Sequence, residues 1–254
     1  CKSIASFNGI PSNLETLGKS AFENCTDLKY STGTLMFPIT LSIIPDRAFY
    51  ECNSLGQIGI RDSILTIGKE AFYNCNSLSL LNNNFNDAIT LIDDYAFYQC
   101  SNLISSDRYL LSFPDSLTRI GRYSFYKAKL ITFSFGENPK LHTIDDYAFS
   151  EATIYGNNVF DITFPDSLIT IGNHAFDQNS KVRGVIFNSK LRTIGSYAFN
   201  KNNQFSGCYK NEYYFNSNYT LIIPNSVTEV GEYAFSNCSE IQYLHLSYNL
   251  QKIS

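Results

Sequence analysis

One recurring stretch decides the fold, and its clearest copy reads Ile67-Gly68-Lys69-Glu70-Ala71-Phe72-Tyr73-Asn74-Cys75. Nine versions of it follow one another along the chain, and each holds a Phe that directly follows an Ala or, once, a Ser. These residues are Phe22, Phe49, Phe72, Phe97, Phe125, Phe149, Phe176, Phe199 and Phe235. The steps between them are 23 to 28 residues, except for a last step of 36. A motif that returns at such a period is typical of a solenoid.

Each repeat is predicted to contain a short strand and a short helix. The strand piece alternates before a Pro, as in Leu111-Ser112-Phe113-Pro114, so that two apolar side chains point inward. The second piece starts at a slot that holds Gly or, in two copies, Asp93 or Asp145, which we interpret as a helix N-cap. The period lies in the leucine-rich-repeat range. The expected fold is an α/β solenoid, a leucine-rich repeat array with a parallel concave sheet and short helices on the convex side.

The repeats extend over the whole sequence, so residues 1–254 are predicted to form a single solenoid. It holds nine repeats plus partial repeats at both ends. A natural solenoid end carries a polar cap, and neither end of this sequence has the pattern of one. We therefore expect the chain to be an internal fragment of a longer array.

Six of the seven Cys residues share one slot, three residues after the Phe of a repeat. The same slot holds Ala128, Ala152, Asn179 and Asn202 in other copies, so we interpret it as a small buried packing site rather than a disulfide or metal site. Cys208 alone lies outside the repeat frame, and its pairing stays open.

Two surfaces are candidates for ligand binding. The outward residues of the predicted concave strands are small and mostly uncharged, and inner faces of solenoids usually bind extended partners. They are Met36, Gly59, Ser112, Ser134, Thr163, Ile186, Ile222 and His245. Most insertions enter just before a strand, which predicts a rim of loops, and only Gly136-Glu137-Asn138-Pro139-Lys140 adds residues after one. The longest rim loop carries Tyr209, Tyr213, Tyr214 and Tyr219.

Two further columns of Tyr follow the predicted convex side, one position after the repeat Phe or two before it. They either shield the joints between repeats or form an aromatic contact surface. Three sequons begin at Asn24, Asn218 and Asn237, and they matter only if the chain passes through a eukaryotic secretory route.

Composition and motifs speak against several function classes. The net charge is −4 with scattered Lys and Arg, so no nucleic-acid partner is expected. No apolar run reaches the ~18 residues of a membrane span. His142, His174 and His245 occupy three different slots, and the pairs Asp93-Asp94 and Asp145-Asp146 are explained by helix capping. We therefore expect no catalytic residues, no metal, no cofactor and no enzymatic activity.

The repeat frame resembles BspA-like leucine-rich repeats, as in Pro165-Asp166-Ser167-Leu168, Ile171-Gly172 and Ala175-Phe176, and the resemblance covers essentially the whole chain. Members are typically cell-surface or secreted proteins of bacteria and protists, implicated in adhesion to host matrix proteins. The resemblance implies a non-catalytic, adhesin-like module that binds a protein, such as an extracellular matrix protein, or a glycan. An intracellular scaffold for protein–protein interaction and a passive structural stalk are the alternatives.

Overall fold

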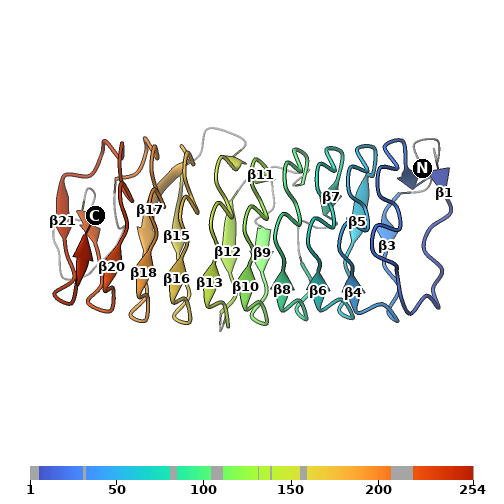
Figure 1. The fold of residues 1–254 in the computed structure, drawn as a ribbon, viewed down its shortest axis with the longest axis horizontal. Helices are drawn as coiled ribbons and strands as arrows, with labels where there is room; N and C mark the ends of the chain where they lie inside the picture. The colour runs from blue at the N-terminus through green and yellow to red at the C-terminus, as the bar shows by residue number, and fades with distance from the viewer. Residues whose placement is uncertain are drawn as a thin grey trace.

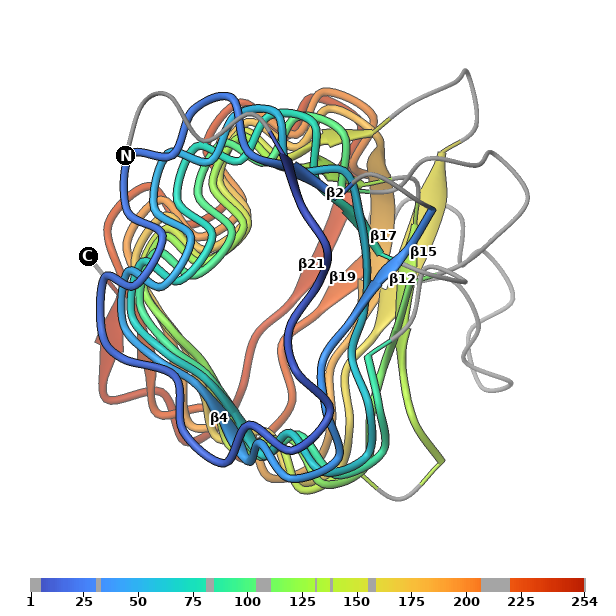
Figure 2. The same cartoon turned by 90° about the vertical axis from the view of Figure 1, so that its right-hand side faces the viewer.

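The protein is a parallel β-solenoid whose coils stack along one axis (Figure 1). The computed structural model describes residues 6–30, 33–80, 85–103, 111–130, 132–137, 139–154, 159–206 and 220–253. Viewed along the axis, successive coils overlie one another and enclose a common interior (Figure 2). The array is therefore a rod, and the face expected to be concave is one side of that rod rather than the inner wall of a horseshoe.

One sheet runs without interruption along the rod. It has nine strands of two residues each, and most of them directly precede the Gly or Asp slot of a repeat. All neighbours are parallel and in register, as Thr143 is with Thr170. The second residue of each described strand from β4 to β18 is buried, so one apolar column closes this wall of the core. The strands are β4 (Ile43–Ile44), β6 (Thr66–Ile67), β8 (Leu91–Ile92), β10 (Arg119–Ile120), β13 (Thr143–Ile144), β16 (Thr170–Ile171), β18 (Thr193–Ile194), β20 (Glu229–Val230) and β22 (Lys252–Ile253).

The strands predicted before each Pro lie on a second side of the rod, which we call the strand face. They do not join into one sheet but into small groups. The groups are β3 (Leu35–Met36) with β5 (Gln57–Gly59) and β7 (Ser79–Leu80); β9 (Leu111–Phe113) with β12 (Phe133–Phe135); β15 (Phe160–Thr163) with β17 (Val182–Ile186); and β19 (Thr220–Ile222) with β21 (Tyr243–His245). Two further pairs are β1 (Ser6–Phe7) with β2 (Lys29–Tyr30), and β11 (Lys129–Leu130) with β14 (Thr153–Ile154).

The prediction of short helices on the far side is wrong, because the described ranges contain strands and turns but no helix. Two residues in each turn segment, two before and two after the repeat Phe, have positive φ. In one coil these are Arg47 and Glu51, both at +56°. A left-handed residue at every fourth position reverses the path of the chain and stops helix propagation. Sequence periodicity alone did not reveal this, since none of these residues is Gly.

Hydrogen bonds explain what stabilises these turns instead. Alternate amides donate along the rod, so that Phe49 N–H donates to the carbonyl of Ala71 in the next coil at 2.9 Å. The amides between them close tight turns within the coil, as Tyr50 N–H donates to the carbonyl of Arg47 at 3.1 Å. Half of the turn segment is thus bonded to its neighbour coil, whereas an α-helix would bond every amide within itself.

The nine repeat Phe rings form a single stack along the core, as predicted. Consecutive ring centroids are 5.1 to 5.4 Å apart, and no interplanar angle in the stack exceeds 14°. The Phe residues that end the strands form a second column, and its rings meet the first edge-on, as Phe113 meets Phe125 at 5.6 Å. Each buried ring contributes roughly 1.5–3 kcal/mol to stability.

The Gly or Asp slot is not a helix N-cap, since no helix follows it in the described residues. Asp146 lies one residue after the slot, and its Oδ1 accepts the N–H of Asn173 in the next coil at 2.7 Å. A Cβ at Gly172 would lie 2.5 Å from the backbone nitrogen of Asp146. The residue in the slot therefore depends on the residue that follows the slot in the preceding coil. Gly occupies the slot where that residue is Asp, Asn or Ser. Where it is Lys or Arg, the slot holds Pro45, Asp93 or Asp145.

The described Cys residues of the repeat slot are free and buried, which confirms the packing interpretation for Cys25, Cys52, Cys75, Cys100 and Cys238. Cys1 and Cys208 lie outside the described residues. The slot also has a polar role that the sequence analysis missed. The thiol of Cys75 donates to the carbonyl of Phe49 in the preceding coil at 2.9 Å, and Asn179 Nδ2 donates in the same way to Phe149 at 2.7 Å.

Candidate functional site

The predicted ligand-binding residues all lie on the strand face, where the structure brings them together in pairs. Residues in register are Met36 with Gly59, Ser112 with Ser134, Thr163 with Ile186, and Ile222 with His245. Gly59 is buried, whereas the others are half-buried or exposed. The face is not one smooth wall, since its ladder is interrupted between the groups of strands. Two of these interruptions open into grooves.

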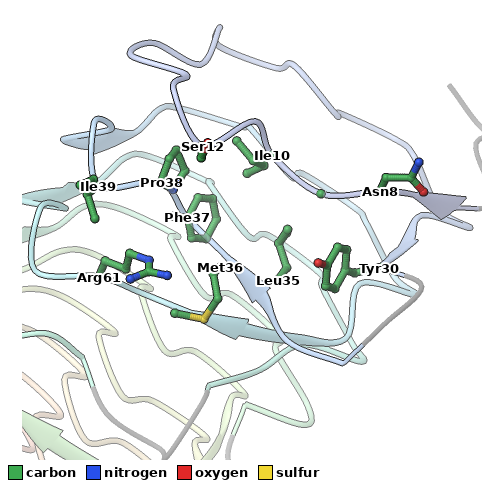
Figure 3. Close-up of a pocket in the computed structure, with 11 residues that line it drawn as sticks. Asn8, Ile10, Ser12, Tyr30, Leu35, Met36, Phe37, Pro38, Ile39 and Arg61 are labelled. Carbon is green, nitrogen blue, oxygen red and sulfur yellow. The ribbon is translucent and has the colours of Figure 1, made fainter.

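The first groove lies where β3 begins the ladder of its group. It has a volume of about 460 Å³ and separates the segment of Asn8, Ile10 and Ser12 from β3 and the residues after it. Figure 3 shows Met36 and Arg61 on one side of the groove and Ile10 on the other. Leu35 and Phe37 are fully buried beneath it. Met36 is the one predicted ligand-binding residue that lines this groove.

The second groove lies between β12 and β15, and we call it the β12–β15 groove. It has a volume of about 570 Å³, and two predicted residues, Ser134 and Thr163, line it together. β12 pairs only with β9 and β15 only with β17. Hydrogen-bonded strands join the same two coils on both sides of the groove, β11 with β14 before it and β13 with β16 after it. The gap is therefore a local opening between two coils that hydrogen bonds join on both sides of it.

In the second Phe column, the distance between ring centroids is larger at this opening. Phe135 and Phe164 lie 6.3 Å apart with their planes tilted by 31°. The next pairs on either side, Phe113 with Phe135 and Phe164 with Phe187, are each 5.7 Å apart and stacked. The cause is visible in the sequence, because Gly136, Glu137 and Pro139, from the one insertion that follows a strand, line this groove. That insertion was the signal from which the groove could have been predicted.

The charges that line the β12–β15 groove are mostly acidic. Asp161 is engaged by Arg183, whose Nε donates to Asp161 Oδ1 at 3.0 Å. Glu137 and Asp166 are exposed, and neither forms an ion pair within the described residues. Lys190 is the lysine at the rim. The two free carboxylates and one ammonium leave a net charge of −1 around an apolar floor that includes Phe133 and Phe164.

The two Tyr columns on the turn side are stacked along the rod. Tyr73 lies 4.7 Å from Tyr50 and 4.5 Å from Tyr98, with nearly parallel planes. Burial, aided by the neighbouring phenols, raises the pKa of Tyr73 to about 12. Because each ring face covers the next ring, these columns shield the joints between coils and present mainly ring edges to a partner.

The titratable groups do not converge on a catalytic arrangement within the described ranges. His174 stacks between Tyr147 and Tyr197, and its Nδ1 is 2.9 Å from Asp177 Oδ2. The prediction that the Asp pairs cap helices is wrong. Three of these carboxylates surround one guanidinium, since Arg119 pairs with Asp93, Asp94 and Asp145 at 2.6 to 3.0 Å. No group of His, Cys, Asp or Glu among the described residues has the arrangement of a metal site.

Several predicted residues fall elsewhere. Tyr209, Tyr213, Tyr214, Tyr219 and Asn218 lie outside the described residues. Asn24 and Asn237 occupy the second left-handed position of their turns, each with φ of +57°. Asn237 Nδ2 donates to Asn200 Oδ1 at 3.2 Å. The described residues contain no helix that is long and apolar enough to cross a membrane.

Comparison with known proteins bears on the family and the fold. The family described as "BspA type Leucine rich repeat region" matches the chain in six copies, over residues 1–107, 29–154, 153–210 and 206–254. No curated protein matches the chain.

Three solved structures illustrate the likeness in fold. A leucine-rich repeat protein from Bacteroides ovatus is 22% identical with a TM-score of 0.52, over 100% of this chain and 75% of that one. A leucine-rich repeat protein from T. pallidum is 19% identical with a TM-score of 0.49, over 82% and 78%. A leucine-rich cell surface protein from Faecalibacterium prausnitzii is 20% identical with a TM-score of 0.44, over 91% and 69%. At these identities the likeness concerns the fold alone.

Proposed function

The chain belongs to the BspA-type leucine-rich repeat proteins, and we propose that it is a non-catalytic binding module of a cell-surface or secreted, adhesin-like protein. Its ligand is a protein, for example of the extracellular matrix, or a glycan. We place the binding surface on the strand face, at the β12–β15 groove. Two of the residues predicted from the sequence, Ser134 and Thr163, come from different hydrogen-bonded groups and line this one groove, which is the observation that carries the proposal.

The rest of the surface supports this choice by contrast. The nine-stranded sheet is a closed ladder whose backbone groups are used between coils. On the turn side, the stacked Tyr rings cover one another's faces. The β12–β15 groove combines depth, apolar floor and polar rim, which are the features of a specific binding site.

The test is a solid-phase binding assay against a panel of immobilised matrix proteins and glycans. Thr163→Arg should fill the groove and abolish capture of the ligand that the unmodified protein retains. Thr90→Arg is the matched control and should bind normally, because Thr90 is an exposed threonine next to β8 that does not line the groove. Capture that is equal for both variants would overturn the assignment of the site.

Two alternatives predict different results. A passive stalk captures nothing from the panel in either form. An intracellular scaffold stays unlabelled when intact cells of the source are treated with an impermeant surface reagent. Labelling of intact cells together with loss of capture by Thr163→Arg supports the adhesin-like module against both.

A further inference from the structure

We propose that the β12–β15 groove receives the side chain of an arginine from an extended segment of a protein partner. The inference rests on the proposed function and narrows its ligand to a protein that presents this residue. Three properties of the groove carry it: backbone acceptors along two facing strand edges, carboxylates at the rim, and an apolar floor.

The backbone acceptors follow from the ladder geometry. Leu111 N–H donates to the carbonyl of Thr132, and Gly136 N–H donates to the carbonyl of Phe113, so the even-numbered residues of β12 face β9. Because the N–H and C=O of one residue point to the same side of a parallel strand, both groups of Phe133 and Phe135 face the gap, and their carbonyls are acceptors there. Phe160 and Phe164 donate toward β17 in the same way, which turns the peptide groups of Asp161 and Thr163 toward the gap from the other side.

These edge groups have no partner strand. No backbone hydrogen bond between β12 and β15 is present in the described part of the chain, although the same coils are paired before and after the groove. The spacing of 6.3 Å between Phe135 and Phe164 exceeds that of neighbouring rings by only 0.6 Å (6.3 against 5.7 Å). A whole strand inserted between two others would need about twice the 4.8 Å strand spacing. The opening therefore excludes an added strand, whereas the groove volume of about 570 Å³ above the two strand edges is large enough for one side chain.

The charges select a cation. Glu137 and Asp166 stand at the rim without an ion pair in the described residues, and Asp161 is already paired with Arg183. An anionic glycan would meet two carboxylates of its own sign. A guanidinium carries five N–H donors in one plane, and such a planar fork suits a narrow slot lined by carbonyls and carboxylates better than an ammonium does. The half-buried ring of Phe135 would cover the methylene stem.

A synthetic probe tests this without knowledge of the natural partner. The probe is a fluorescein-labelled, amidated peptide, Gly-Thr-Val-Arg-Val-Thr-Gly, and its control replaces Arg by the uncharged isostere citrulline. We expect fluorescence anisotropy to show that the Arg peptide binds the unmodified protein about tenfold more tightly, the size of one charge-assisted hydrogen bond. Equal affinity for both peptides, or no binding of either, overturns the inference.

Variants locate the preference in the groove. Glu137→Gln combined with Asp166→Asn should remove the preference for Arg over citrulline, whereas Lys190→Met should strengthen it. Asp62→Asn is the matched control, because Asp62 occupies the same turn position as Asp166 in another coil and does not line the groove. A preference that survives in the double variant, or that disappears in Asp62→Asn, contradicts the proposed site.

The outcomes separate this inference from the proposed function. If Thr163→Arg abolishes capture of a matrix protein or glycan but the unmodified protein does not distinguish Arg from citrulline, the binding module stands and the arginine assignment falls. If the Arg preference follows the variants as expected but no panel member is captured, the groove is confirmed as a cation site and the adhesin-like function falls.

Discussion

The turn side and the strand face of this rod are built by the same repeats, yet one is uniform and the other is interrupted. On the turn side, the eight distances between consecutive rings lie within 5.1 to 5.4 Å, although the step in sequence from one ring to the next varies from 23 to 36 residues. On the strand face, the ladder divides into groups and the second Phe column opens to 6.3 Å at the β12–β15 groove. Core packing and inter-coil hydrogen bonds thus fix the turn side, while the strand face accommodates the described insertion residues Gly136, Glu137 and Pro139.

The largest expected change in the free energy of unfolding comes from a substitution in the Phe stack of the turn side. Phe125→Ala removes a fully buried ring between two stacked neighbours and should lower the free energy of unfolding by about 3–5 kcal/mol. Ser134→Ala on the strand face should change it by less than about 0.5 kcal/mol. Denaturant unfolding measures both. Phe22→Ala, whose ring is only partly buried and has one stacked neighbour in the column, should fall between them. Equal losses for the two Phe variants would contradict a core held by contacts between neighbouring coils.

The buried thiols beside the Phe stack make stability depend on pH. Burial raises the pKa of Cys75 well above that of a free thiol, and that of Cys52 to about 12. Since the unfolded chain loses these protons near pH 8.5, their contribution is full below that pH and is lost as the pH rises further. From pH 8 to pH 10, Cys75→Ala should lose about 2 kcal/mol less stability than the unmodified protein, measured by urea unfolding in reductant. Parallel losses would show that this thiol is not shielded.

A glycine substitution distinguishes the left-handed turns from the helices that the sequence had suggested. Gln178 is exposed and has φ of +61°, so Gln178→Gly should raise the unfolding free energy by up to about 1 kcal/mol. In a helix the same change would lower it by about the same amount. Thermal or denaturant melts give the sign directly. Asn8→Gly, outside the turn segments, serves as a control in which no such gain is expected.

The smallest expected effect is a difference in amide hydrogen exchange rate between β12, at the edge of the β12–β15 groove, and the nine-stranded sheet. The amides of Phe133 and Phe135 face the β12–β15 groove without a strand partner and should exchange at least tenfold faster than those of Ile144 and Ile171 in the nine-stranded sheet. Mass spectrometry after peptic digestion can resolve the segments. Equal protection of the two sets would mean that the ladder closes between β12 and β15 in solution.

The sequence predicted the solenoid, the stack of nine Phe rings and the register of the strand face because these depend on periodic burial. It could not predict the left-handed turns, since positive φ fell on Arg47, Tyr95 or Lys127 and never on a Gly in these slots. Because no Gly marked these left-handed positions, the turn segments were interpreted as short helices. The nine-stranded sheet was also missed, because each of its strands is only two residues long and gives no alternation of its own.

The β12–β15 groove could be predicted only in part from the sequence. Ser134 and Thr163 were identified as outward residues, but their meeting in one groove depends on a missing ladder between two coils. Only the insertion around Glu137 and Pro139 hinted at that gap. The pairing of Gly with a preceding Asp, Asn or Ser could have been read from the repeats, yet its reason, a close approach between coils, required the coordinates.

The distance between consecutive repeat Phe rings does not depend on the number of residues in the coil. Phe235 follows Phe199 by 36 positions and Phe72 follows Phe49 by 23 positions, yet both pairs of ring centroids lie 5.4 Å apart. The additional residues of the longer step therefore leave the spacing of the coils unchanged. A rod of this kind becomes longer only by adding whole coils, because the number of residues in a coil does not change the rise from one ring to the next.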